Sequence, residues 1–329
     1  MDTTPKHGKI AFITTPDFRK NRPIVAEAFV YRHMYSLCQF FTVVTTGRTH
    51  DEFLCKILNR PLSKTKKPFR KMIEDDMRFK LQNQSDLVKW RDTIKSGLEP
   101  TKPSYPGMIH IAYELVEGRL DAVIHLTDWM DKSAKPDSAV LSREANVHNV
   151  PAATDVDTAT AFIESWHAKI ARSSKKTGLF REREENKNPP LRNIEKNDKV
   201  IALVAHDNMK LDMCCFAVEH AAHIFSRYDY ILSTGTTGGW LKRFMEAAGR
   251  GRDEIKRIRC CNSGPLGGDL QIAYAVVEEL CHEIIFLQDP SVSHAHDSDI
   301  RLFEQAVLHK DVNVKLATNL ASARLLIGV

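Results

Sequence analysis

The segment GMIHIAYELVEGRLDAVIHLTD at residues 107–128 returns without a gap as GDLQIAYAVVEELCHEIIFLQD at residues 268–289. Each copy joins an amphipathic stretch, typical of a helix, to a short apolar run that is rich in Ile and Val. The run ends in Asp in both copies and has the length of a buried strand. The chain therefore contains a helix–strand unit twice, which predicts an internal duplication.

Three further blocks repeat around this segment, in the same order in both halves. They are KIAFITTPDFRK (9–20) with VIALVAHDNMK (200–210), VVTTGRT (43–49) with ILSTGTT (231–237), and VPAATDVDTATAFI (150–163) with VKLATNLASARLLI (314–327). Short apolar runs alternate with longer amphipathic stretches throughout. This alternation predicts an α/β fold of two tandem three-layer α/β/α domains, each with a mainly parallel sheet flanked by helices.

The spacing between the copies predicts an insertion in the first half. Aligning Asp17 with Asp207 gives an offset of 190 residues, whereas the gap-free segment is offset by 161. The difference, about 29 residues, falls in a basic stretch at about 55–105 that reads as one or two amphipathic helices.

Domain boundaries follow from the repeat and from composition. The polar, charged stretch 169–198 contains a Pro pair and reads as a linker. We therefore predict a degenerate domain at 1–168, which carries the helical insert, and a catalytic domain at 199–329.

Composition narrows the class of protein. The 329 residues are 43% hydrophobic and 27% charged, and no apolar run approaches the roughly 18 residues that cross a bilayer. The N-terminus lacks the apolar core of a signal peptide, so we expect a cytoplasmic protein without a membrane partner. The seven cysteines show no C-x-x-C spacing, which argues against a disulfide framework or a zinc ribbon.

Positive charge is concentrated in two segments. Residues 55–103 hold 13 Lys and Arg against 6 Asp and Glu, and residues 169–198 hold 9 against 5, while the whole chain carries only +5. The aromatics of the first segment, Phe69, Phe79 and Trp90, are too sparse to suggest stacking platforms for bases. We therefore expect a solvated helical face and no nucleic-acid partner.

Polar clusters follow four predicted strands of the second half. They comprise His206, Asp207 and Lys210; Thr234, Gly235, Thr236 and Thr237; Ser263, Gly264 and Asp269; and Asp289, His296, Asp297 and Asp299. Ligands of parallel sheets bind at the carboxyl ends of strands, and Gly-rich turns at helix starts suit phosphate. Together, the clusters suit proton abstraction from a phosphorylated carbonyl compound without a metal.

The motifs VAHDNMK, STGTTGG, SGPLGGD, DP at 289–290, HDSD at 296–299 and ATN at 317–319 resemble the motif set of the methylglyoxal synthase family. The resemblance covers residues 199–329 and implies conversion of dihydroxyacetone phosphate to methylglyoxal and phosphate without a cofactor. It also implies homo-oligomers and inhibition by phosphate.

The resemblance also implies roles for individual residues. Asp269 would be the base, and His296 would polarise the carbonyl and stabilise the enediolate. His206, Asp207, Asp289 and Asp299 would shape the pocket or orient their neighbours. The phosphate group would be held by seven residues, namely Lys210, Thr234, Gly235, Thr236, Thr237, Ser263 and Gly264.

The first half lacks part of this set. In the alignment, Pro16 stands for His206, Met108 for Asp269, and PDSA at 136–139 for HDSD. The residues that remain are Asp17, Lys20, Thr46, Gly47, Thr49 and Asp128. Two hypotheses stay open: a synthase fused to an inactive copy, or a non-catalytic regulatory module in which both halves sense a phosphorylated metabolite.

Overall fold

The computed structural model describes residues 6–78, 80–101, 107–128, 136–172, 180, 185–186, 189–289, 297–308 and 313–328. At residues 62, 136–138, 297–299 and 302 it describes the backbone alone. The chain forms two compact units, Met1–Glu185 and Asn186–Val329. None of the described helices is long and apolar enough to span a membrane.

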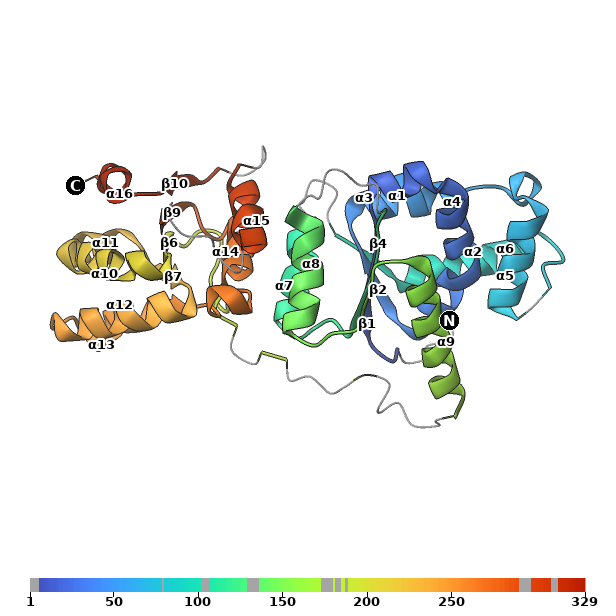
Figure 1. Ribbon diagram of the computed structural model, residues 1–329, viewed down its shortest axis with the longest axis horizontal. Coiled ribbons are helices and arrows are strands. Elements are labelled where there is room, and N and C mark those ends of the chain that lie inside the picture. The colour runs from blue at the N-terminus through green and yellow to red at the C-terminus, as the bar shows by residue number, and fades with distance from the viewer. Residues whose placement is uncertain are drawn as a thin grey trace. The chain divides into compact units, whose positions relative to one another are not determined.

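The N-terminal unit is built on a parallel sheet in the order β3-β2-β1-β4-β5. Its strands are β1 (Lys9–Thr14), β2 (Thr42–Thr45), β3 (Leu98–Pro100), β4 (Ala122–Leu126) and β5 (Ala152–Ala153). Its helices are α1 (Pro16–Asn21), α2 (Pro23–Phe40), α3 (Gly47–Thr49), the π-helix η1 (His50–Leu54), α4 (Cys55–Leu58), η2 (Leu62–Lys64), α5 (Lys67–Met77), α6 (Gln84–Gly97), α7 (Gly107–Val116), α8 (Pro136–Val147) and α9 (Val156–Arg172). In Figure 1, α7 and α8 lie on one face of this sheet and α2 and α9 on the other.

The C-terminal unit repeats this plan with the strand order β10-β9-β6-β7-β8, all pairs parallel. Its strands are β6 (Val200–Ala205), β7 (Tyr230–Ser233), β8 (Ile258–Cys260), β9 (Glu283–Leu287) and β10 (Lys315–Ala317). Its helices are η3 (Asp207–Met209), α10 (Lys210–Glu219), α11 (Ala221–Arg227), α12 (Gly235–Ala247), α13 (Arg252–Lys256), η4 (Gly264–Leu266), α14 (Gly268–Val277), α15 (Asp297–Val307) and α16 (Leu320–Ile327). Helices α10 and α12 cover one face and α14 and α15 the other (Figure 1), so the prediction of two α/β units with helix-flanked parallel sheets is confirmed.

Each unit has its own apolar core. In the N-terminal unit, side chains of one face of β1 and β2, such as Ile10, Phe12 and Val43, pack against α2 and α9. In the C-terminal unit, Ile201, Leu203 and Ile231 do the same against α10 to α12. Both faces of each sheet are covered, which explains why its central strands read as continuous apolar runs.

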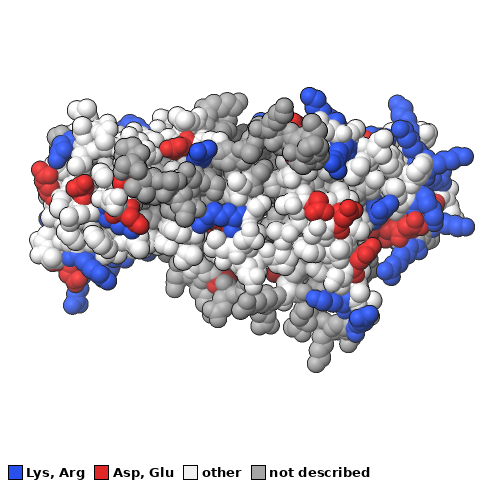
Figure 2. Space-filling model, in the orientation of Figure 1, with Lys and Arg blue, Asp and Glu red and all other residues white. Residues whose placement is uncertain are grey.

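Helices α5 and α6 belong to the N-terminal core. Tyr31 of α2 stacks on Phe69 of α5 and on Trp90 of α6, with ring centroids 4.9 and 5.8 Å apart. Phe69 and Trp90 are therefore buried and cannot stack on nucleic-acid bases; Phe79 lies outside the described residues. Figure 2 shows Lys and Arg gathered on the surface over α5 and α6. The exposed Lys residues of this stretch include Lys66, Lys67, Lys71, Lys89 and Lys95.

Strand pairing corrects one part of the predicted alignment. Thr14 pairs with Leu126, and Ala205 pairs with Leu287, which is the equivalent of Leu126 in the gap-free segment. Thr15 is therefore the counterpart of His206, and the predicted match of Pro16 with His206, like that of Asp17 with Asp207, was wrong by one residue. The apolar strands look alike in either register, so only the ladder of hydrogen bonds fixes it.

Candidate active site of the C-terminal unit

The loops that follow β6, β7, β8 and β9 carry most of the predicted site residues. These strands are parallel neighbours, so their carboxyl ends meet at one edge of the sheet. That edge is where open parallel sheets bind ligands. The hydrogen bonds of the described residues form three groups along it.

The first group fixes His206 at the end of β6. Its backbone N–H donates to the carbonyl of Leu287 (3.0 Å), and its ring Nδ1 accepts from the backbone N–H of Asp289 (2.9 Å). The ring also meets Phe286 edge-on, with centroids 4.9 Å apart. Because Nδ1 is an acceptor here, the proton of the neutral ring sits on Nε2, which makes His206 a donor through that atom.

Asn208 joins the same group, although the sequence analysis did not select it. Its Nδ2 donates to Oδ2 of Asp289 (2.7 Å) and so ties the loop after β6 to the loop after β9. The available signal was its place inside the VAHDNMK motif, directly beyond His206 and Asp207.

The second group positions Lys210 at the turn after β7. Its Nζ donates to Oγ1 of Thr236 (2.9 Å) and forms an ion pair with Asp207. The Lys210 side chain is only 12% exposed, whereas that of Asp207 is 89% exposed. Asp207 therefore lies on the solvent side of the pair, and Lys210 presents a largely buried cation to the Thr236 turn.

The third group links the turn after β7 to the turn after β8, both of which contain glycine. Oγ1 of Thr234 donates to Oγ1 of Thr237 (3.2 Å), and both residues are buried. The N–H of Gly235 donates to the carbonyl of Asn262 (2.8 Å). A Cβ at Gly235 would lie 3.0 Å from the backbone N of Ser263, so a larger residue would require the turn after β8 to shift by a few tenths of an ångström.

The turn after β8 leads directly to the predicted base. Gly267 adopts a left-handed conformation (φ 88°), and a Cβ at Gly268 would lie 2.0 Å from the carbonyl oxygen of Asn262. The buried Gln271, which the sequence analysis missed, accepts from the backbone N–H of Asn262 (2.6 Å). This frame holds Asp269 in the first turn of α14, where it is 5% exposed.

The remaining predicted residues cannot be placed in the same detail. His296 lies outside the described residues, and for Asp299 only the backbone is described, in the first turn of α15. Ser263 and Gly264 lie at the start of η4, within the turn that packs on Gly235.

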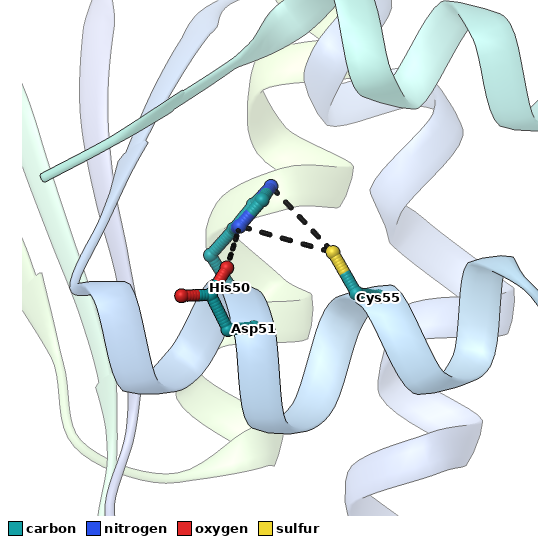
Figure 3. Close-up of side chains that lie close together, drawn as sticks. All are labelled: His50, Asp51 and Cys55. Atoms are coloured by element: carbon teal, nitrogen blue, oxygen red, sulfur yellow. Dashed lines mark hydrogen bonds and ion pairs between the residues drawn. The ribbon is translucent and has the colours of Figure 1, made fainter. Parts of the chain in front are cut away.

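A separate cluster lies in the N-terminal unit, where the π-helix η1 meets α4 (Figure 3). Nδ1 of His50 contacts Oδ1 of Asp51 (2.7 Å), and both ring nitrogens lie 3.8 Å from Sγ of Cys55. The cluster offers three donor atoms within 4.8 Å of one another, one fewer than structural zinc sites use. Burial raises the pKa of the Cys55 thiol, which disfavours the thiolate that a metal requires, so we assign no metal to it.

Comparison with known proteins finds methylglyoxal synthases among the sequence relatives of this chain. No known family model matches the chain. A methylglyoxal synthase of Thermus thermophilus is 40% identical over 131 residues, which cover 40% of this chain and 93% of that protein. A methylglyoxal synthase of Clostridioides difficile is 43% identical over 129 residues, which cover 39% of this chain and 83% of that protein. The matched length is close to that of one unit.

Among solved structures, the crystal structure of methylglyoxal synthase from Elizabethkingia anophelis matches with a TM-score of 0.34 and 30% identity. The match covers 40% of this chain and 78% of that one.

Proposed function

Because the chain belongs to the methylglyoxal synthase family, we propose that its C-terminal unit converts dihydroxyacetone phosphate to methylglyoxal and inorganic phosphate. One observation carries the proposal. The buried carboxylate of Asp269 lies in the first turn of α14, directly after the turn that follows β8. The backbone of that turn is hydrogen-bonded to Gly235 in the Thr234–Thr237 turn. A base and an anion cradle thus share one edge of the sheet.

In the proposed reaction, Asp269 removes a proton from the hydroxymethyl carbon of the substrate. The negative charge that develops on the carbonyl oxygen needs a hydrogen-bond donor, because a carbon acid of this kind ionises too weakly at neutral pH without one. We assign this role to His296 from its motif, and a second N–H to Nε2 of His206, whose tautomer is fixed by Asp289.

The phosphate group then leaves. The hydroxyl on the carbon that lost its proton becomes the aldehyde carbonyl, and its proton leaves with the phosphate. The electron pair of the enediolate shifts to form a new carbon–carbon double bond as the carbon–oxygen bond to phosphate breaks. The released enolate then takes up a proton on its terminal carbon to become methylglyoxal. Lys210 would offset the charge of the leaving phosphate, and the hydroxyls of Thr234, Thr236 and Thr237 would hydrogen-bond to it. Asp207, which is paired with Lys210, would orient that cation.

We propose that the N-terminal unit does not carry out this reaction. Met108 occupies the position of Asp269 at the start of α7, and a thioether cannot accept a proton from carbon. A single active unit per chain is the consequence.

The test uses the full chain with dihydroxyacetone phosphate and follows methylglyoxal and phosphate together. We expect equal release of both by the wild type and a loss of about 10²–10⁴-fold in Asp269→Asn. Asp253→Asn is the matched control, because Asp253 also lies in the first turn of a helix but is 96% exposed and away from the site.

The alternative, a module that senses a phosphorylated metabolite, gives a different result in the same experiment. Saturable binding of dihydroxyacetone phosphate without release of either product would support the sensor and reject the enzyme. Incubation in heavy water adds a second readout, since deuterium entering the substrate would report proton abstraction even if elimination failed.

A further inference from the structure

The phosphate turn of the C-terminal unit has a counterpart in the N-terminal unit. Oγ1 of Thr46 donates to Oγ1 of Thr49 (3.0 Å), as Thr234 does to Thr237 (3.2 Å). The N–H of Gly47 donates to Oγ1 of Thr101 (3.1 Å), just as that of Gly235 is bonded to the turn after β8. The N-terminal unit therefore has the same hydroxyl pair and a hydrogen bond that anchors its Gly47 N–H.

The strand register also identifies a cation at this turn. With Thr15 matched to His206, Arg19 becomes the counterpart of Lys210, and Arg48 that of Thr236. The contacts agree, because Nη1 of Arg19 donates to the carbonyl of Arg48 (2.9 Å) where Nζ of Lys210 donates to Thr236. Both side chains are 12% exposed.

The N-terminal turn carries more positive charge than its counterpart. Arg48 is exposed and supplies a second guanidinium where the C-terminal unit has a threonine. Burial lowers the pKa of Arg19, and the charge of Arg48 lowers it further, while Glu52 opposes this. Glu52 lies 3.3 Å from Arg19 and is itself 55% exposed, so its charge is screened by water.

Two more hydroxyls lie at the ends of the strands that carry this turn. Thr14 and Thr45 are 3% and 0% exposed, and their Oγ1 atoms have no hydrogen-bond partner among the described residues. The backbone N–H of Thr14 is bonded to Oγ1 of Thr49, which places Thr14 beside the turn. Buried hydroxyls without a partner are rare in proteins and suggest a missing ligand or water.

We propose that the N-terminal unit binds a phosphate group at the Thr46–Thr49 turn through Arg19 and Arg48, and releases it unchanged. The ligand is an inorganic phosphate or the phosphate group of a small metabolite. It is not turned over, because Met108 stands where Asp269 would abstract the proton. The chain thus has two phosphate sites and one catalytic centre.

The test counts phosphate sites on the full chain by equilibrium dialysis with radiolabelled inorganic phosphate. We expect about two per chain in the wild type and one in the double variant Arg19→Gln, Arg48→Gln. Lys210→Gln removes the other site, so it also retains one. Lys20→Gln is the matched control, because Lys20 is exposed on the same helix as Arg19 and should leave both sites intact.

Arg48→Glu guards against an effect on folding, because Arg48 is exposed and its charge can be reversed without disturbing the core. We expect it to weaken binding at the N-terminal site at least 10-fold. Equal site counts in the wild type, the double variant and Arg48→Glu would overturn the proposal.

Binding measurements on the Lys210→Gln variant, which keeps only the N-terminal site, distinguish free phosphate from a phosphorylated metabolite as the ligand. Tighter binding of dihydroxyacetone phosphate than of inorganic phosphate at the remaining site would identify a phosphorylated metabolite, and equal affinity would identify free phosphate. Failure of catalysis in the wild type would reject the proposed function but would leave this site count unaffected.

Discussion

The two units have the same framework and differ in the residues placed on it. Both sheets have five parallel strands in matching order, and both turns after the second strand pair two threonine hydroxyls. The differences lie in the loops, where Thr15 replaces His206 and Met108 replaces Asp269. The fold is determined by the buried strands and the way they pair, whereas the reactions that each unit can carry out depend on a few residues at the ends of those strands.

The largest expected effect comes from the proposed base, and it tests whether this one residue accounts for the difference in catalytic activity between the two units. Asp269→Asn should reduce product formation by about 10²–10⁴-fold, because an amide cannot take a proton from carbon. Adding Met108→Asp to this variant should not restore activity, since the N-terminal unit also has Thr15 where the C-terminal unit has His206. Recovery of methylglyoxal release in the double variant would show that the two sites differ by the base only.

The next effect compares the glycines at the starts of α14 and α7. Gly268→Ala would place a Cβ 2.0 Å from a backbone carbonyl oxygen, so we expect a loss of about 3 kcal/mol in unfolding free energy. At Gly107 the nearest atom is the side-chain Oγ1 of Thr101, 2.5 Å away. It can move only by giving up the hydrogen bond that it accepts from Gly47, which costs about 1 kcal/mol, so the loss should be smaller.

Gly239→Ala is the control for this pair. Nothing lies within 4 Å of a Cβ at this position in α12, so the substitution should stabilise the helix by about 0.5–1 kcal/mol. Urea unfolding of the three variants measures these differences. A loss at Gly107 as large as that at Gly268 would contradict the distinction between backbone and side-chain neighbours.

A pH effect is expected in the N-terminal unit. Burial raises the pKa of Asp76 in α5 from 3.8 to about 7, although it accepts hydrogen bonds from the backbone N–H groups of Tyr35 and Ser36. A carboxyl group that is more easily protonated when folded costs stability as the pH rises from about 4 to about 7. Asp76→Asn removes that cost, so its gain in unfolding free energy should be about 2 kcal/mol larger at pH 8 than at pH 5.

Asp75→Asn is the control for the pH experiment, because Asp75 is the neighbouring residue on the same helix and is 59% exposed. Its effect should be the same at both pH values. A gain for Asp76→Asn that does not change with pH would show that the carboxyl group titrates in its ordinary range.

The smallest effect tests the shared hydroxyl pair. Thr49→Val and Thr237→Val keep the side-chain shape but remove one buried hydrogen-bonding group each, so we expect losses of about 1 kcal/mol in both units. Thr49 also accepts from the backbone N–H of Thr14, which should make its loss the larger of the two. Equal thermal stability of Thr49→Val and the wild type would argue against a common role for the pair.

The sequence allowed the duplication and the α/β architecture to be predicted, because the helix–strand segment recurs without a gap and its apolar pattern is strong. It did not determine how β1 aligns with β6, because an apolar strand that is buried on both faces looks the same when it is shifted by one residue. That single residue changes the counterpart of Lys210 from Lys20 to Arg19.

Residues of the candidate site that belong to motifs could be selected from the sequence. Residues that contribute through hydrogen bonds between distant parts of the chain could not. Asp269 and Lys210 could be selected from the sequence, whereas Gln271 bonds to the backbone N–H of Asn262, nine residues before it, and Asn208 bonds to Asp289, 81 residues away. The π-helix η1 could not be predicted from the repeat either, because the equivalent part of the second copy, in α12, is a regular α-helix.

The place at which α5 and α6 enter the chain explains why the N-terminal unit tolerates them. They lengthen the connection between the central strand and its partner: Ile10 and Ala122 pair across 112 residues, whereas Ile201 and Glu283 pair across 82. The entropy of closing a loop grows only with the logarithm of its length, so the longer connection costs about 0.3 kcal/mol. A chain can therefore acquire two helices, and a new basic surface with them, at almost no thermodynamic penalty to the sheet that it interrupts.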